Sequence, residues 1–360
     1  MNMKNRLRPD LAGLVPYDLD TDLDGRIRLN ANESPWAIDG VSAGTNRYPV
    51  PQPPLLRARM AALYDVPESR LWIGRGSDEV IDLLLRAFCE ARRDNILIHA
   101  PTFGMYRIGA RLQGAECRAA GTHPSDAFAL DPERLLSLVD DHTKLVIVCS
   151  PNNPTGTLHH AAIAWLAERL EGRAMLVVDE AYIEFAEIAS AAPLIDRYSN
   201  VAVLRTMSKA HALAGARIGA LIAHDDIASF IGRIATPYPL PTPSVDLALA
   251  ALQPDALGRE GQRIAQTISE RARVARALSD LASVRELWPS SANFLLTRFT
   301  DGKRALQRAS AAGIVVRDVS SQPDLDNCLR ITIGAPNEND ALLNALSSRV
   351  EAPALMEQPA

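Results

Sequence analysis

Residues 175–182 read MLVVDEAY, an apolar run that ends on two carboxylates. Three further short apolar runs have the same character: Asn95–His99 (NILIH), Leu145–Cys149 (LVIVC) and Val201–Leu204 (VAVL). Runs of this length without polar alternation are typical of parallel strands that are buried on both faces. Helix-like stretches lie between them, and strands that alternate with helices predict an α/β fold with a parallel sheet.

The chain changes character after a proline-rich segment. Residues 236–244 read TPYPLPTPS, and we expect an extended connector there, because proline disrupts helix interiors and central strands. A long helical pattern over 258–282 follows, and then come strand-like runs, among them Ile314–Val316. This part predicts a smaller α+β unit, with the boundary between the two units near residues 236–255.

Composition excludes several classes of protein. The 360 residues are 47% hydrophobic and 22% charged, which is typical of a globular chain. The net charge of −5, without a basic stripe, argues against nucleic-acid binding. No signal peptide or membrane-length apolar stretch is found, so we expect a cytoplasmic protein. The four cysteines form no CxxC pair and His159-His160 lacks a third ligand, so we expect no metal site and place that histidine pair on a loop surface.

A lysine follows the last of the four apolar runs. Thr206, Ser208 and Lys209 come directly after the expected strand, and Arg217 follows at a short distance. A lysine at a strand end can form a Schiff base with a carbonyl cofactor, while hydroxyls and an arginine suit a phosphate. Taken alone, the pattern is more typical of a surface lysine in a βα loop.

Three other segments place polar groups at strand or helix ends. Asp179 ends a buried strand, where it could pair with a protonated pyridine nitrogen. It could also be the N-cap of a helix or a ligand of Mg²⁺. Asn153 lies in SPNNPTG (150–156), which supplies an amide donor or simply a turn. GRGSDE (74–79) begins a helix whose N–H groups could bind phosphate, although it matches neither GxGxxG nor a P-loop. Together the segments supply what pyridoxal phosphate requires.

These motifs resemble the fold-type I pyridoxal-phosphate-dependent aminotransferases of class II, and among them the branch that acts on histidinol phosphate. The likeness covers nearly the whole chain. Its most specific segments are SPNNPTG (150–156), DEAYIEF (179–185) and SKAHALAGARIG (208–219). The resemblance implies an N-terminal arm (1–35) packing with the small domain, a large cofactor-binding domain (36–245) with a mainly parallel seven-stranded sheet flanked by helices, and a small α+β domain (246–360).

The resemblance also implies roles at a pyridoxal 5'-phosphate site. Lys209 would form the Schiff base, Asp179 would pair with the ring nitrogen, and Tyr182 would join Asn153 at the ring oxygen O3′. Phe103 would stack on the ring, where many members have Tyr. The phosphate would be held by Gly76, Ser77, Asp78, Thr206, Ser208 and Arg217. Tyr48 matches a position that reaches the neighbouring subunit's phosphate site, which implies a homodimer with shared active sites.

Two arginines carry the implied substrate preference. Arg330, in CLRITIG, matches the arginine that binds a substrate carboxylate, and Arg317 lies 13 residues earlier, as in the histidinol-phosphate branch. Such a pair could bind the phosphate of histidinol phosphate and the carboxylates of glutamate or 2-oxoglutarate. Family positions near the substrate entrance are occupied by Tyr17, Asn32 and Tyr238. His211 departs from the pattern, because close relatives have Phe there, and we expect a buried neutral imidazole.

The implied reaction is a ping-pong transfer of the amino group between L-histidinol phosphate and 2-oxoglutarate, as used in histidine biosynthesis. Two alternatives would use the same Lys, Asp and Arg groups. One is an aromatic amino-acid aminotransferase, and the other is a pyridoxal-phosphate decarboxylase of a phosphorylated amino acid. PYPLPTP (237–243) and the segment 316–334 favour the first reaction over both alternatives.

Overall fold

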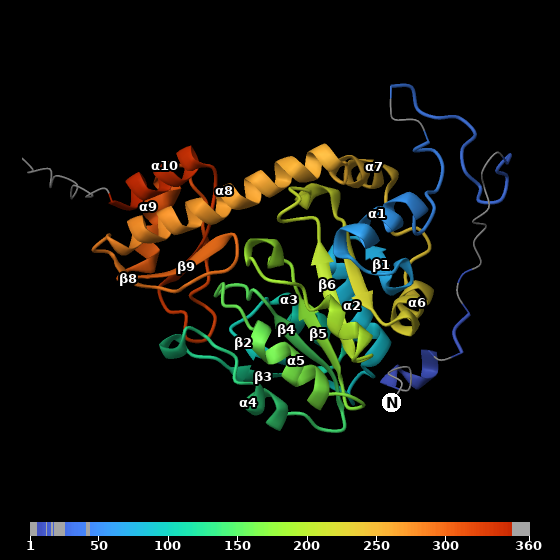
Figure 1. The fold of residues 1–360 in the computed structure, drawn as a ribbon, viewed down its shortest axis with the longest axis horizontal. Helices are drawn as coiled ribbons and strands as arrows, with labels where there is room; N and C mark the ends of the chain where they lie inside the picture. Colours follow the sequence, from blue (N-terminus) through green and yellow to red (C-terminus); the bar gives the residue numbers. More distant parts are fainter. Residues whose placement is uncertain (1–5, 12, 16, 18–25, 41–43, 348–360) are drawn as a thin grey trace, which may run out of the picture.

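The computed structural model describes residues 6–11, 13–15, 17, 26–40 and 44–347, which contain two β-sheets and a long connecting helix (Figure 1). The larger sheet has seven strands in the order β1-β7-β6-β5-β4-β2-β3. Only β7 is antiparallel to its neighbours, and the other pairs of strands are parallel. The prediction of a mainly parallel seven-stranded sheet is therefore confirmed. Its strands are β1 (Leu71–Gly74), β2 (Asn95–Ala100), β3 (Glu116–Gly121), β4 (Thr143–Cys149), β5 (Met175–Asp179), β6 (Val201–Thr206) and β7 (Gly219–Ala223).

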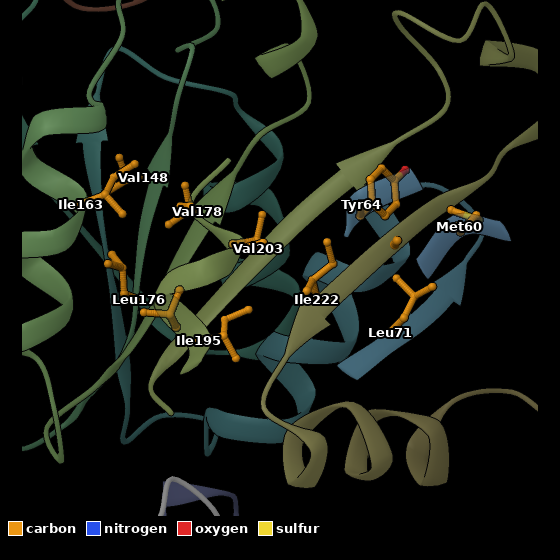
Figure 2. Close-up of a cluster of buried hydrophobic side chains, with 14 of the residues drawn as sticks. Met60, Tyr64, Leu71, Val148, Ile163, Leu176, Val178, Ile195, Val203 and Ile222 are labelled. Atoms are coloured by element: carbon orange, nitrogen blue, oxygen red, sulfur yellow. The ribbon is translucent and has the colours of Figure 1, made fainter. Parts of the chain in front are cut away.

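Helices cover both faces of this sheet, which explains the lack of polar alternation in its central strands. Successive side chains of a strand point to opposite faces. Leu176 and Val178 therefore belong to one apolar cluster, shown in Figure 2, and Met175 and Val177 belong to another. The first face is covered by α1 (Pro54–Tyr64), α4 (Pro132–Ser137), α5 (His160–Arg169) and α7 (Thr242–Ala251), and the second by α2 (Ser77–Phe88), α3 (Met105–Gln113) and α6 (Asp225–Ile234).

The second sheet is smaller and wholly antiparallel, with the strand order β10-β11-β9-β8. Leu295 and Ile331 of this sheet pack against Val274 and Leu278 of α8. At 1.5 Å per residue the 26 residues of α8 span about 39 Å, from beside α7 to the small sheet (Figure 1). The elements of this unit are α8 (Pro254–Ser279), β8 (Val284–Leu287), β9 (Phe294–Phe299), α9 (Gly302–Ala311), β10 (Arg317–Asp318), β11 (Cys328–Thr332) and α10 (Pro336–Ser347).

Three local predictions are wrong. The proline-rich segment is not extended throughout, because α7 begins at Thr242 with Pro243 in its first turn, where a missing N–H costs no hydrogen bond. Strand pairing begins at Arg317 rather than at residue 314, and the apolar Val315 is 96% exposed. His159 is buried rather than on the surface, and its ring meets the ring of His99 edge-on at 4.6 Å.

Candidate active site

The carboxyl ends of β4, β5 and β6 border a cavity of about 230 Å³, and the small sheet contributes one side chain to it. The cavity brings together eleven residues that the sequence singled out: Ser77, Asp78, Phe103, Asn153, Asp179, Tyr182, Thr206, Ser208, Lys209, Arg217 and Arg330. Cys149, Ala181 and Ala214 line the cavity as well and were not predicted. The parallel strands of the sheet place these groups at one edge, as expected for an open α/β fold.

One end of the cavity is built to receive an anion. The first turn of α2 begins at Ser77 without a side-chain cap, so its main-chain N–H groups point outward. The Arg217 guanidinium donates to Ser208 Oγ at 3.3 Å and to Asp78 Oδ2 at 3.3 Å. Thr206 Oγ1 donates to Ser208 Oγ at 3.0 Å. Hydroxyls, a guanidinium and a helix N-terminus are the donors that a phosphate group prefers.

Two glycines allow this end of the cavity to form. Gly76 has a φ of +81°, and a Cβ atom there would overlap the Arg217 guanidinium. A Cβ atom at Gly219 would overlap the main chain of Gly76 and Ser77. The start of β7 can therefore lie directly against the N-terminus of α2 only because residue 219 has no side chain.

Asp179 forms the floor of the cavity and is 3% exposed. Tyr106 Oη donates to its Oδ2 at 2.6 Å, and the main-chain N–H of Ala181 donates to its Oδ1 at 3.1 Å. Burial raises the pKa of Asp179, and these hydrogen bonds lower it in part. Among the described residues no cation forms an ion pair with this carboxylate, so a positively charged ligand atom beside it would relieve the cost of its burial.

Lys209 follows the end of β6 and faces the same space. Its Nζ lies 5.5 Å from the centre of the Tyr182 ring. Burial lowers the pKa of Lys209, and the positive charge of Arg330 lowers it further. The amine is therefore more easily deprotonated than a lysine on the surface, as a nucleophile or base requires.

Arg330 connects the two sheets at the cavity. It extends from β11 of the small sheet, and its Nη1 donates to Oδ1 of Asn153, in the loop after β4. Nδ2 of Asn153 donates in turn to Tyr182 Oη at 3.3 Å. The Nε atom of Arg330 is buried and has no hydrogen-bond partner among the described residues. An anionic ligand at this side of the cavity would supply that missing acceptor.

Besides Gly76, which directly precedes Ser77 at the anion-binding end, five predicted residues do not line this cavity. Arg317 is exposed on β10, directly opposite Arg330 in the antiparallel register. Tyr48 is exposed, and its ring stacks on that of Tyr238 with centroids 4.4 Å apart. The remaining two are Asn32, which lines a separate pocket with Tyr48, and Tyr17, which lines another with Trp72.

Tyr106 is the functional candidate that reasoning from the sequence missed. It is fully buried, lies three residues after Phe103 in APTFGMY (100–106), and its ring meets that of Phe103 edge-on at 5.5 Å. A tyrosine on a helix next to the predicted ring-stacking residue was a signal, but the sequence does not reveal that its hydroxyl reaches a carboxylate 73 residues away.

Comparison with known proteins agrees with this geometry. The family profile described as "Aminotransferase class I and II" matches residues 18–346. The chain belongs to this aminotransferase family. It is 46% identical over 349 residues to the histidinol-phosphate aminotransferase of Stenotrophomonas maltophilia strain R551-3, covering 95% of this chain and 96% of that one.

Solved structures of aminotransferases have the same fold. A putative histidinol-phosphate aminotransferase from Erwinia carotovora atroseptica superposes with a TM-score of 0.75 at 26% identity, over 89% of this chain and 94% of that one. The histidinol-phosphate aminotransferase from Sinorhizobium meliloti, solved in complex with pyridoxal-5'-phosphate, gives 0.74 at 25% identity, over 84% and 82%. Aminotransferases of this family depend in general on pyridoxal phosphate.

Proposed function

We propose that this aminotransferase transfers the amino group between L-histidinol phosphate and 2-oxoglutarate, giving imidazole-acetol phosphate and L-glutamate in histidine biosynthesis, with pyridoxal 5'-phosphate as its cofactor. The observation that best supports this proposal is that Lys209, Asp179 and Arg217 line one cavity, which Arg330 also reaches. An amine, a buried acid and an anion-binding group are thus combined in one place.

The residues present fit the cofactor. The buried Asp179 carboxylate, with neutral hydrogen-bond donors, suits the protonated ring nitrogen. The anion-binding end formed by the α2 N-terminus and Arg217 suits the phosphate, and Phe103 offers an aromatic face at the cavity wall. When bound, pyridoxal phosphate supplies an aldehyde that condenses with amines and a ring that takes up the electrons released when a Cα–H bond breaks.

Lys209 is the group that moves protons in this proposal. Its lowered pKa makes the neutral amine available as a base at the substrate Cα, and the same nitrogen then returns the proton as an acid. The Asp179 carboxylate would keep the ring nitrogen of the bound cofactor protonated. The Asn153 amide and the Tyr182 hydroxyl, which are hydrogen-bonded to each other, would contact the ring oxygen O3′.

The two arginines of the small sheet account for the proposed substrates. Arg330 offers a buried Nε that has no hydrogen-bond partner in the described part of the chain, and Arg317 lies opposite it on the next strand. The side chains of this pair could bind the phosphate of one substrate and the carboxylates of the other by bidentate contacts. Tyr17, Asn32 and Tyr238 are proposed to border the substrate entrance.

We further propose a homodimer in which Tyr48 completes the phosphate site of the neighbouring subunit. Tyr48 lies outside the cavity of its own chain. Large apolar side chains nearby are exposed, among them Ile27, Leu29 and Trp36, and exposed apolar surface of this kind marks interfaces. Mixing Lys209→Ala and Tyr48→Ala subunits would create hybrids with one intact shared site. Activity above that of either parent is expected, and its absence would contradict action across the interface.

Two further expectations stay predictions. One is the division into an arm (1–35), a large domain (36–245) and a small domain (246–360). The other is a cytoplasmic location without nucleic-acid partners. Within the described part of the chain, no helix is both long and apolar enough to span a membrane.

The test of the proposed function is a half-reaction titration. The purified protein with bound cofactor would be mixed with L-histidinol phosphate, and its visible spectrum followed to the pyridoxamine form. We expect L-histidinol phosphate to convert the cofactor fully, and at a lower concentration than phenylalanine requires. In the matched variant Arg317→Leu, the concentration of histidinol phosphate required should rise while that of phenylalanine stays unchanged, because only the first ligand carries a phosphate.

Other results would assign another reaction. Conversion by phenylalanine or tyrosine alone would favour an aromatic amino-acid aminotransferase, and release of CO₂ would favour a decarboxylase of a phosphorylated amino acid. A protein without any cofactor spectrum would overturn the proposal as a whole.

A further inference from the structure

His211 lies where the turn that carries Lys209 meets the long helix α8. The residue is 7% exposed, and its Nδ1 lies 2.8 Å from Oε2 of Glu260, a buried residue of α8. An ionised carboxylate only accepts hydrogen bonds, so with Glu260 ionised this bond requires the tautomer that carries a proton on Nδ1. The bond joins residues 49 positions apart in the chain, and the proposed reaction does not itself use it.

One face of α8 lies against the segments that follow β5 and β6. Glu260, Ile264 and Arg271 share this face, because spacings of about four and seven residues return to the same side of an α-helix. Ile264 packs against the apolar cluster that contains Ala210, the residue between Lys209 and His211. Arg271 Nη1 donates to the main-chain carbonyl of Phe185 at 3.2 Å. The His211–Glu260 bond is therefore one of several contacts that seat α8 on the loops of the active site.

The opposite side of the His211 ring faces the large domain. Its Nε2 lies 3.7 Å from Oε1 of Glu184, and this carboxylate accepts a hydrogen bond from Arg205 Nη2 at 2.9 Å. Arg205 directly precedes Thr206, which borders the anion-binding end of the cavity. The imidazole thus lies between a carboxylate of the large domain and a carboxylate of α8. Without it, Glu260 would be left buried and without this donor, which is costly for a charged group.

The turn that carries Lys209 is short and internally bonded. The N–H of Ala212 donates to the carbonyl of Lys209 at 3.1 Å, and the N–H of Leu213 donates to that of Met207 at 3.0 Å. Ala212 has a φ of +56°, in the left-handed region. A turn this compact moves as a unit, so a contact that holds His211 also restricts the main chain of Lys209.

We propose that His211 is a positioning residue: its hydrogen bond to Glu260 holds the lysine-bearing turn against α8. The same helix packs beneath β9 and β11, and Arg330 extends from β11. The bond therefore helps to fix the amine of Lys209 relative to the arginine that faces it. In its consequence for catalysis this inference rests on the proposed function of Lys209.

The test uses two substitutions at residue 211 that differ in hydrogen bonding. In His211→Asn the side-chain amide can replace the Nδ1–H donor, whereas His211→Phe keeps an aromatic ring and removes the donor. Gln262→Ala, at an exposed position of α8, serves as the matched control. Hydrogen exchange of the peptide 207–213 would be measured in the cofactor-free proteins, and kcat and KM for histidinol phosphate in the holoenzymes.

We expect His211→Phe to raise the exchange rate of this peptide about three- to tenfold, the effect of one lost hydrogen bond. In the holoenzyme kcat should fall about tenfold, with KM changed by less than about twofold, because orientation rather than binding is lost. In His211→Asn, the exchange rate of the peptide and kcat should both stay close to the wild-type values. Combining His211→Phe with Glu260→Ala should be no worse than either change alone, because both remove the same bond.

The two proposals fail in different ways. Unchanged exchange in His211→Phe, or equal effects of Phe and Asn, would overturn the positioning role even if the wild-type enzyme turns over as proposed. A wild-type protein that neither binds the cofactor nor transaminates would overturn the proposed function and, with it, the catalytic consequence of the His211–Glu260 bond.

Discussion

Tyr106→Phe removes one oxygen atom from the most buried part of the active site. The hydroxyl donates to Asp179 Oδ2 at 2.6 Å, and the tyrosine is fully buried. Phenylalanine keeps the ring that packs edge-on against Phe103. The substitution therefore tests the hydrogen bond with little change in packing.

The expected size follows from the charge of the acceptor. A hydrogen bond to a charged group contributes about 1.5–3 kcal/mol, which corresponds to about a 10- to 100-fold change in rate if it is expressed fully in the transition state. Burial raises the pKa of Asp179 and the Tyr106 hydroxyl lowers it, so removing the hydroxyl raises this pKa further. The carboxylate form then persists only at higher pH. We expect kcat to fall by about 10- to 100-fold and the acidic limb of the pH–rate profile to move to higher pH.

The assay is steady-state transamination as a function of pH, with Tyr64→Phe as the control. Tyr64 is also buried, but its hydroxyl has no hydrogen-bond partner among the described residues, so its removal should leave the profile unchanged. A Tyr106→Phe enzyme with the wild-type kcat and an unmoved acidic limb would refute the reasoning. It would mean that Tyr106 serves packing alone.

Three further outcomes are expected. Lys209→Ala should abolish turnover, and normal catalysis by this variant would contradict the assignment of the reactive amine. Arg217→Met should weaken cofactor binding by about 10- to 100-fold, from the loss of charge-assisted hydrogen bonds to the phosphate; fluorescence titration of the cofactor-free protein measures this, and an unchanged Kd would count against the anion site. Gly219→Ala should destabilise the fold by about 1–3 kcal/mol, because its Cβ would overlap the main chain at Ser77; equal unfolding midpoints in urea would show that the close approach is not rigid.

The central strands were predictable because their burial leaves a local mark. Met175–Asp179 and Val201–Thr206 are covered by helices on both faces, so nearly every residue in them is apolar and the run is visible without any knowledge of partners. Strand β7, Gly219–Ala223, was not predicted. It is antiparallel, begins with a glycine and is rich in small residues, and its role depends on the helix end that lies against it.

The sequence by itself determined which groups stand at the ends of the strands, because motifs such as SPNNPTG and the segment around Lys209 place polar residues directly after apolar runs. Only the tertiary structure decided which distant residues complete them. Tyr106 meets Asp179 across 73 positions and His211 meets Glu260 across 49, and Arg330 reaches Asn153 from another sheet across 177. Such pairs leave no local pattern, because a hydrogen bond depends on the position of both atoms in space, and that position is set by the packing of whole helices and strands.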